Sequence, residues 1–541
     1  MSTIKTKVMT ILLFAAIALS ACQPAVAPTQ APKATDAPTV APAPKATDAP
    51  KPTQPPAPTA VPTAVPTMAP AVDITYYTVG GFPKDLDAVS AAASDMLKKK
   101  GINANFKIVS HDWGTWRDQM KLTYAGNEAC DIVFAPFWGG VIGYNTLARD
   151  GVLLDLTDLL AKNAPKTWAS YTPAFWNGGR IDGKIYGVPA GGAFVQNLGI
   201  IVRKDLVEKY KFDVTTVKPG DWNALVPLWN AAKADKIIPF GDFGINSPAY
   251  GGYDIVDASA NLVVKFDDPQ RKVVFYPTTD QYKQAVTLMH QWFLAGYTYK
   301  DPSNNDDNIA NLQAGKVLAQ WLGAAMKPGV VDMEWKPRIA NNKYDGVAIP
   351  MTTTPFIPGT SFTQNVNSIC KASKNPTVAL QVLELMNTDQ EFYNLLAIGI
   401  EGKHWVWDDK AAQVIKAGPN QADYTPGWGW EVGNTLLGYY PNKTVADAKI
   451  WDVTNKENNT APVSVMMGFA FNQDPVKTEY ASVVAAITEA DHDLGAADTG
   501  GRADNVDAAI ANLVKKSTDA GLAAVIAEAQ KQIDAWAATQ K

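Results

Sequence analysis

The sequence predicts an α/β protein of two lobes, preceded by a leader peptide and a disordered linker. Two successive runs of alternating strand-like and helix-like segments indicate two sheets covered by helices. A chain of 541 residues is also too long for one compact core. Because 47% of the residues are hydrophobic and 19% are charged, the composition is that of an ordinary globular protein.

The chain opens with the features of a secretory signal peptide. Lys5 and Lys7 precede an apolar run, Val8–Ala21, that ends on small residues directly before Cys22. This run is shorter than the about 20 apolar residues of a membrane-spanning helix. The ending Leu-Ser-Ala-Cys resembles the bacterial lipobox, in which the cysteine is lipidated. We therefore expect a signal peptide at 1–21 and a lipid anchor on Cys22, at the extracytoplasmic face of the cell membrane. The alternative is an ordinary signal peptide that contains a cysteine.

Residues 22–72 form a linker rich in proline, alanine and threonine. The octet APKATDAP occurs twice, at 31–38 and at 43–50. So few apolar side chains cannot offset the entropy lost on ordering, and no fold is expected. At about 3.1 Å per residue the extended segment reaches on the order of 150 Å, so it predicts a tether between membrane and folded protein.

The first folded pattern alternates strands and helices. The segments DITYYTVGG, NANFKIVS and CDIVFAP read as strands, and a helix is expected from about Asp85 to Lys100, with a second in TWRDQMKLTYAG. This order predicts a doubly wound lobe, whose ligands bind beyond the carboxyl ends of the strands. Trp113, Phe137 and Trp138 follow such strand ends and are candidate ligand contacts.

The pattern restarts after the glycine-punctuated segment IDGKIYGVPAGG. Strands are expected at LGIIVRKD and at KVLAQWLG (316–323), with helices near 221–234 and at 280–295. Two α/β patterns joined by a short strand predict two lobes with a hinge between them.

Several chemistries are not indicated. A net charge of −5 argues against nucleic acid or anionic lipid as the main partner. The chain has no Gly-x-Ser-x-Gly, no phosphate-binding Gly-x-x-x-x-Gly-Lys-Ser/Thr loop and no His-Glu-x-x-His zinc motif. Its four histidines are far apart in the sequence. We expect no catalytic residue, no metal and no cofactor.

The acidic stretch Asp301–Asn308 is a weak calcium candidate. An EF-hand loop has glycine at its sixth position and glutamate at its twelfth, whereas these positions here are Asp306 and Leu312. Capping of the following helix by Asp306 or Asp307 is the better interpretation.

Two cysteines remain after the proposed anchor. Cys130 and Cys370 each flank a strand-like run. In an oxidising compartment they can pair, but two buried free thiols fit the sequence equally well.

Several motifs together resemble a known family. DIVFA, LARDGVLLDLTDLL, DGKIYGVP and GKVLAQWLG occur in the order found in extracellular solute-binding proteins of ABC importers. The chain is similar to the carbohydrate-binding branch, which includes the maltodextrin-binding protein. The segments GFAFNQDPVKTEYASV and VIAEAQKQIDAW resemble a lipoprotein subgroup with a distinctive C-terminal module. The resemblance runs from Asp73 to Trp536.

The resemblance implies two α/β lobes that close on a ligand by hinge bending and then dock on a permease. The implied lobes are 73–187 with 358–398, and 188–357 with 399–541. The implied crossings lie near Tyr186–Pro189, Ile349–Pro358 and Ile398–Lys403. Both remaining cysteines then fall in the first lobe on neighbouring antiparallel strands, which favours a disulfide. The implied partners are a sugar or oligosaccharide, the permease and its ATPase, and the binding protein itself is expected to be monomeric.

Sugars present apolar C–H faces and a ring of hydroxyls, so their sites combine flat aromatic side chains with short polar ones. Trp321 matches the position of a tryptophan that stacks on sugar in the maltodextrin-binding relatives, and the segment PGWGWEVGN matches one that faces the cleft. The candidate ligand-binding residues are Trp113, Phe137, Trp138, Gln196, Asn197, Tyr253, Asp254, Trp321, Trp428, Trp430 and Asn434. For each aromatic the alternative is burial in a core. Glu401, Lys403 and His404 also stand together, but the resemblance implies a structural turn there.

Three alternatives accompany this interpretation. A cell-surface glycoside hydrolase would need two carboxylates about 5 to 9.5 Å apart in a cleft. A binding protein for peptides or polyols would use a similar aromatic and polar cleft. A surface adhesin would suit the tether, but adhesins are usually repeat-built or all-β.

Overall fold

The structure, a computed structural model, describes residues 70–126, 130–241, 244–299, 308–322, 329–332, 335–336, 340, 343–494 and 503–539. The predicted signal peptide, Cys22, all but the end of the linker, and residues 301–307 of the acidic stretch lie outside these ranges. No helix within the described ranges is long and apolar enough to cross a membrane.

The first sheet has five strands in the order β2-β1-β3-β14-β6. They are β1 (Val72–Val79), β2 (Ala104–His111), β3 (Ile132–Phe134), β6 (Gly187–Pro189) and β14 (Val366–Ile369). β1 runs parallel to β2 and β3, whereas β14 runs antiparallel to β3 and β6. β2 alternates buried and less buried residues at the sheet edge, while every residue of β3 is buried, as expected for a strand covered on both faces. The predicted α/β order of this segment is confirmed.

Helices cover this sheet because each presents one apolar side to it. In α1 (Leu86–Lys99) the buried residues Val89, Ala93 and Leu97 recur at helical spacing, and Gly101 follows with a φ of +85°. The other helices with this sheet are α2 (Trp116–Ala125), α3 (Tyr144–Arg149), α4 (Leu160–Asn163), α5 (Pro165–Ala169), α6 (Pro173–Asn177), α11 (Pro376–Thr388) and α12 (Gln390–Ile398).

The second sheet has four strands in the order β13-β7-β12-β8. They are β7 (Gly199–Arg203), β8 (Ile238–Phe240), β12 (Val317–Leu322) and β13 (Gly346–Pro350), with helices α7 (Lys204–Lys209), α8 (Val226–Ala234), α9 (Asp280–Leu294) and α10 (Asn308–Gln313). Trp229, Phe240 and Trp292 form an aromatic group in its core, with ring centroids 5.5 to 6.2 Å apart, and Trp292 meets the other two rings edge-to-face.

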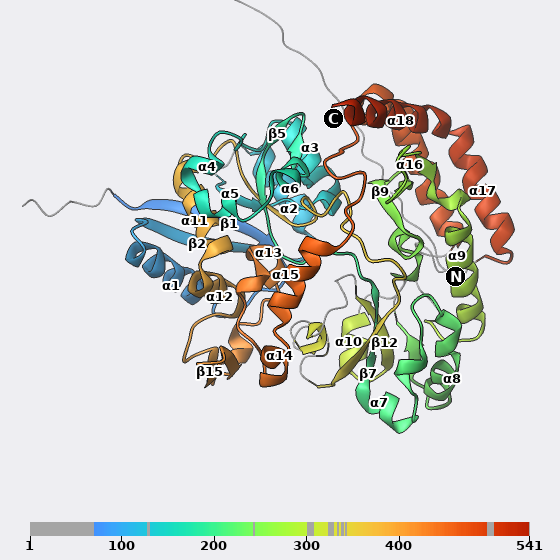
Figure 1. Cartoon of the computed structure of the whole chain (residues 1–541), viewed down its shortest axis with the longest axis horizontal. Helices are drawn as coiled ribbons and strands as arrows, with labels where there is room; N and C mark the ends of the chain where they lie inside the picture. The colour runs from blue at the N-terminus through green and yellow to red at the C-terminus, as the bar shows by residue number, and fades with distance from the viewer. Residues whose placement is uncertain are drawn as a thin grey trace, which may run out of the picture. The chain divides into compact units, whose positions relative to one another are not determined.

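A third, antiparallel sheet carries the C-terminal helices. It comprises β9 (Tyr253–Asp257), β10 (Leu262–Lys265) and β11 (Val274–Phe275). The helices α16 (Lys477–Leu494), α17 (Val506–Asp519) and α18 (Leu522–Ala538) share one buried core with it. Figure 1 shows these three helices, in red, beside β9 and α9, in green, although α9 ends at Leu294 and α16 begins only at Lys477.

Smaller elements complete the described chain. These are β4 (Arg180–Ile181), β5 (Lys184–Ile185), β15 (Trp405–Asp409), β16 (Val414–Ala417), α13 (Gly429–Val432), α14 (Lys443–Asp447) and α15 (Ile450–Thr460).

The third crossing differs from the expected one. We expected the chain to leave the first lobe near Ile398–Lys403, but Tyr424 and Trp428 are buried in the same core as β1 and α12. The chain meets the third sheet only later, where the Val465 N–H donates to the Phe266 carbonyl at 3.0 Å. Two large side chains that are each 1% exposed hold this segment against the first sheet, which explains the difference.

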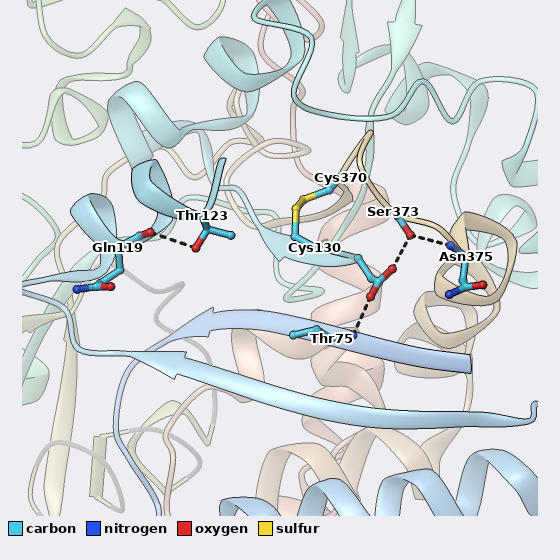
Figure 2. The surroundings of a disulfide bond; sticks show 8 residues. Thr75, Gln119, Thr123, Cys130, Cys370, Ser373 and Asn375 are labelled. Carbon is cyan, nitrogen blue, oxygen red and sulfur yellow. Dashed lines mark hydrogen bonds between the residues drawn. A yellow bond between two sulfur atoms is a disulfide. The ribbon is translucent and has the colours of Figure 1, made fainter. Parts of the chain in front are cut away.

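A disulfide joins Cys130, two residues before β3, to Cys370, directly after β14, with the Cα atoms 5.7 Å apart (Figure 2). The Asp131 carboxylate beside it accepts hydrogen bonds from the Thr75 N–H at 3.0 Å and the Ser373 hydroxyl at 2.5 Å. These contacts fasten β14 to the N-terminal part of the sheet. β14 and its neighbour β3 are far apart in the sequence.

Removal of this disulfide should lower stability without changing the site. The bond closes a sequence separation of 240 residues, so the double variant Cys130→Ala, Cys370→Ala should lose about 2–5 kcal/mol of unfolding free energy. Denaturant unfolding followed by circular dichroism measures this loss. Reductant should shift the wild-type midpoint equally and leave the variant unchanged; a wild-type midpoint that is insensitive to reductant would contradict the assignment.

Candidate functional site

Three tryptophans that are distant in sequence meet at one edge of the first sheet. The rings of Trp113 and Trp430 are nearly parallel, with an interplanar angle of 11° and centroids 6.2 Å apart. Trp138 lies 6.2 Å from Trp113 and 6.4 Å from Trp430. Beneath them, Trp116 and Phe134 are buried and contact Trp138 at 5.7 and 5.9 Å. We call Trp113, Trp138 and Trp430 the tryptophan platform.

The strand ends explain two of these positions. Trp113 follows β2, and Trp138 follows β3 in a 3-10 turn, η1 (Phe137–Ile142). Because β2 and β3 flank β1 in parallel, their carboxyl ends lie at the same edge of the sheet. Trp113 is 50% exposed, whereas Trp138 and Trp430 are partly buried. An exposed indole at this edge is available to a ligand.

A polar network behind the platform holds Trp430. The Glu431 carboxylate is buried and accepts hydrogen bonds from the Thr78 hydroxyl and, at 3.4 Å, from the Val79 N–H. The Glu431 carbonyl accepts from the Tyr76 hydroxyl at 3.3 Å and from the Asn367 amide at 2.8 Å. Burial and the neighbouring Glu431 raise the pKa of Tyr76 well above its usual value, so this hydroxyl stays protonated and can donate. β1 and β14 thus fix the position of α13.

A cavity of about 300 Å³ lies beside Trp321, at the end of β12. Asn246 is 7% exposed, and neither its Oδ1 atom nor the Trp321 Nε1 has a hydrogen-bond partner within the described part of the chain. Both residues line the cavity, and a ligand with hydroxyl groups offers the partners that these two atoms lack. The lining residues are Asn246, Ser247, Pro248, Ile255, Asp257, Ala258, Asn261, Leu262, Val263, Tyr276, Tyr282 and Trp321. We call this the Trp321 cavity.

One carboxylate lines the Trp321 cavity. Asp257 accepts hydrogen bonds from the Ala260 N–H at 2.8 Å and from the Tyr480 hydroxyl at 3.1 and 3.2 Å to its two oxygens. Burial raises the pKa of Asp257, and these hydrogen bonds oppose that rise. The carboxylate therefore has a fixed orientation at the cavity wall.

The other polar candidates lie along the segments between the sheets. Gln196 and Asn197 are partly buried, and the Gln196 N–H donates to the Phe356 carbonyl at 2.7 Å. The Asn434 side chain accepts a hydrogen bond from the Leu436 N–H at 3.1 Å. The apolar candidate Phe137 lies beside Trp138 in η1 and is partly buried.

Three candidates have structural contacts in this conformation. Trp428 is 1% exposed, and its indole N–H donates to the Leu396 carbonyl at 2.9 Å. Asp254 is 2% exposed and accepts from the Ile255 N–H at 2.8 Å and the Gly359 N–H at 2.5 Å, and burial raises its pKa to about 6. The Lys265 ammonium lies 4.0 Å from the centroid of the Tyr253 ring.

The segment with Glu401 and His404 forms a turn. His404 is fully buried, and its Nδ1 accepts from the Ile400 N–H at 2.9 Å, so the proton lies on Nε2, 3.0 Å from Asp85. Hydrogen bonds from His404 and Lys403 lower the pKa of Asp85. Both ring nitrogens of His404 are therefore engaged in structural hydrogen bonds. Among the described residues no group of three or more His, Cys, Asp or Glu could hold a metal ion.

The class of protein is given by its match to a known family. Residues 83–391 match the bacterial extracellular solute-binding proteins, and the chain belongs to this family. This confirms the resemblance to extracellular solute-binding proteins that the sequence motifs indicate. Residues 465–538 match a second family, described as a domain of unknown function, DUF3502.

Individual relatives can then be named. A carbohydrate ABC transporter substrate-binding protein of Streptococcus pneumoniae is 28% identical over 474 residues, which is 86% of this chain and 91% of that protein. The N-glycan transport solute-binding protein NgtS from the same species has a crystal structure that is 26% identical, with a TM-score of 0.75, and covers 87% of this chain and all of that one. A second NgtS structure, in complex with Man5GlcNAc, has a TM-score of 0.70 at 26% identity, over 87% of this chain and 99% of that one.

Sequence reasoning missed most of the Trp321 cavity. Asn246 follows β8, which is parallel to β12, so the strand-end rule that found Trp113 also applies to it. Asp257 ends β9, Tyr276 lies in the turn after β11, and Tyr282 lies in α9, where no local pattern marks a ligand contact.

Alanine substitutions should separate the platform from the core. Trp428→Ala should lower the unfolding free energy by about 3–5 kcal/mol, because it empties a fully buried site. Trp113→Ala should cost about 1 kcal/mol or less, since half of the side chain is already exposed. Denaturant unfolding of both variants measures the difference, and equal losses would show that Trp113 belongs to the core.

Proposed function

We propose that the protein is the substrate-binding component of an ABC importer and captures an oligosaccharide between two lobes. The observation that carries the proposal is the tryptophan platform, in which three indoles from three separate segments share one sheet edge. Aromatic faces pack against the C–H faces of sugar rings, while the polar atoms of the Trp321 cavity suit hydroxyl groups. Sugar-binding relatives with similar structures support the same conclusion.

Binding would act by closure of the lobes rather than by covalent chemistry. The first lobe would contain the five-stranded sheet and the second the sheet with β7 and β12, joined near Tyr186–Pro189 and Ile349–Pro358. A ligand that contacts both lobes favours the closed state by its extra contacts there. A permease and its ATPase would accept the closed, monomeric complex. Cys22 would tether the protein to the membrane through the linker.

A glycoside hydrolase is the second candidate, and the placement of the acids argues against it. Hydrolysis needs two carboxylates converging on one glycosidic bond. At the platform, Glu431 is 1% exposed and bonded to Thr78; at the Trp321 cavity, Asp257 is bonded to Tyr480. Both acids are thus held by internal hydrogen bonds, which supports binding without cleavage.

Titration of the purified protein with glycans tests this proposal. Tryptophan fluorescence and calorimetry would be recorded with mannose, Man1GlcNAc and Man5GlcNAc, with a peptide and a polyol as comparisons, and each mixture would be checked for hydrolysis. Saturable binding of intact oligosaccharide is the expected result. Cleaved glycan would favour the hydrolase, and binding of the peptide or polyol alone would refute the sugar assignment.

Trp113→Ala should weaken oligosaccharide binding about tenfold to a hundredfold, because a lost aromatic contact costs about 1.5–3 kcal/mol. Calorimetric titration measures the change. Leu294→Ala is a matched control, since it removes an apolar side chain that is 71% exposed on α9. A Trp113→Ala protein that binds as tightly as this control would exclude Trp113 from the site.

A further inference from the structure

The C-terminal helices α16, α17 and α18 belong to neither of the two larger sheets. They coincide with the segment that matches a domain of unknown function, residues 465–538. Their buried side chains form one core with β9, β10 and β11 (Figure 1). Since β9 and β10 also supply one side of the Trp321 cavity, these helices lie directly behind a cavity wall.

One hydrogen bond reaches from the helices to a cavity-lining group. The Tyr480 hydroxyl on α16 lies 3.1 and 3.2 Å from the two oxygens of Asp257, at the end of β9. The tyrosine is partly buried, and burial raises the pKa of its hydroxyl, so it remains a donor. Because Asp257 lines the cavity, the orientation of its carboxylate depends on a residue outside the cavity.

A second set of contacts holds the edge strand of the same sheet. The Gln530 side chain on α18 accepts from the Val273 N–H at 2.9 Å and donates to the Arg271 carbonyl at 3.3 Å. The Arg271 guanidinium lies 5.7 Å from the ring of Trp536. These contacts fix β11, which pairs with the cavity-lining residues Leu262 and Val263.

We propose that the C-terminal helices hold the wall of the Trp321 cavity in its binding geometry, with Tyr480 as the positioning residue for Asp257. The identity of the ligand rests on the function proposed above, whereas the positioning of Asp257 by Tyr480 does not. A carboxylate with a fixed orientation accepts hydrogen bonds from sugar hydroxyls in a defined direction. The C-terminal helices would therefore help to determine the affinity for the ligand.

The test compares two matched tyrosine variants in the full chain. Tyr480→Phe removes only the hydroxyl that meets Asp257. Tyr210→Phe is the control, because it removes a tyrosine–aspartate bond of 2.8 Å to Asp235, directly after α7. In the protein without ligand, amide hydrogen exchange of residues 253–265 should rise in Tyr480→Phe and not in Tyr210→Phe. Equal exchange in Tyr480→Phe and wild type would overturn the proposal.

With Man5GlcNAc as the probe, Tyr480→Phe should bind about tenfold more weakly than wild type, because an Asp257 carboxylate that is no longer fixed loses its own hydrogen bond to a sugar hydroxyl. The midpoint of denaturant unfolding should match that of the control variant. Wild-type affinity in Tyr480→Phe would contradict the proposal. If the wild type binds no glycan, the proposed function fails, and hydrogen exchange still decides whether Tyr480 positions the wall.

The pH dependence gives a readout that a purely structural bond would not move. The groups that face the Asp257 carboxylate are the Tyr480 hydroxyl from α16 and the N–H groups of Ser259 and Ala260 from its own turn, with Tyr276 and Tyr282 in the same cavity. Loss of the hydroxyl raises the pKa of Asp257 further, since that bond favours the ionised form. Affinity should therefore fall at a higher pH in Tyr480→Phe than in wild type as the solution is acidified; coincident pH profiles would count against the proposal.

Discussion

The architecture depends on one strand pairing, the insertion of β14 between β3 and β6. β6 ends at Pro189 and β14 begins at Val366, so the entire second sheet is built from the chain between two neighbouring strands of the first. Both connections must then pass between the sheets, which is the geometric requirement for a hinge. The disulfide between Cys130 and Cys370, together with Asp131, fastens this pairing at one end of β14.

The same strand also determines where the platform forms. Asn367 on β14 and Tyr76 on β1 both bond the Glu431 carbonyl, which brings α13 to the edge where Trp113 and Trp138 lie. A buried carboxylate in such a network needs a hydrogen-bond partner. The Thr78 hydroxyl meets that need for the Glu431 carboxylate. The proposed binding surface therefore combines an aromatic face with a hydrogen-bonded network behind it.

The Trp321 cavity has a different construction. Its floor comes from the second sheet, whereas its wall comes from an antiparallel sheet stabilised by helices far along the chain. Substitutions in the C-terminal helices can therefore alter this wall while the hinge and the tryptophan platform stay the same. This separation offers a physical route by which proteins of one fold acquire sites for different glycans.

Local sequence patterns were sufficient for the main elements and for part of the candidate site. The alternation in β2, the apolar run of β3 and the spacing in α1 identify the first sheet, and the strand-end rule identifies Trp113 and Trp138. The composition of residues 22–72 predicts a linker by the same local logic, although those residues lie almost entirely outside the structure.

Only the tertiary structure decided which candidate side chains are accessible. Trp428 and Trp430 are two residues apart in a glycine-rich segment, yet one is buried beneath Leu396 and the other faces Trp113. Asp254 looks like a ligand contact in the sequence, but it accepts two backbone hydrogen bonds in a closed interior. What the sequence determined by itself is the set of elements and the aromatic residues at their ends. Which side chains are buried, and which hydrogen-bond partners they have, depends on contacts between segments up to several hundred residues apart. Local periodicity carries no information about those contacts.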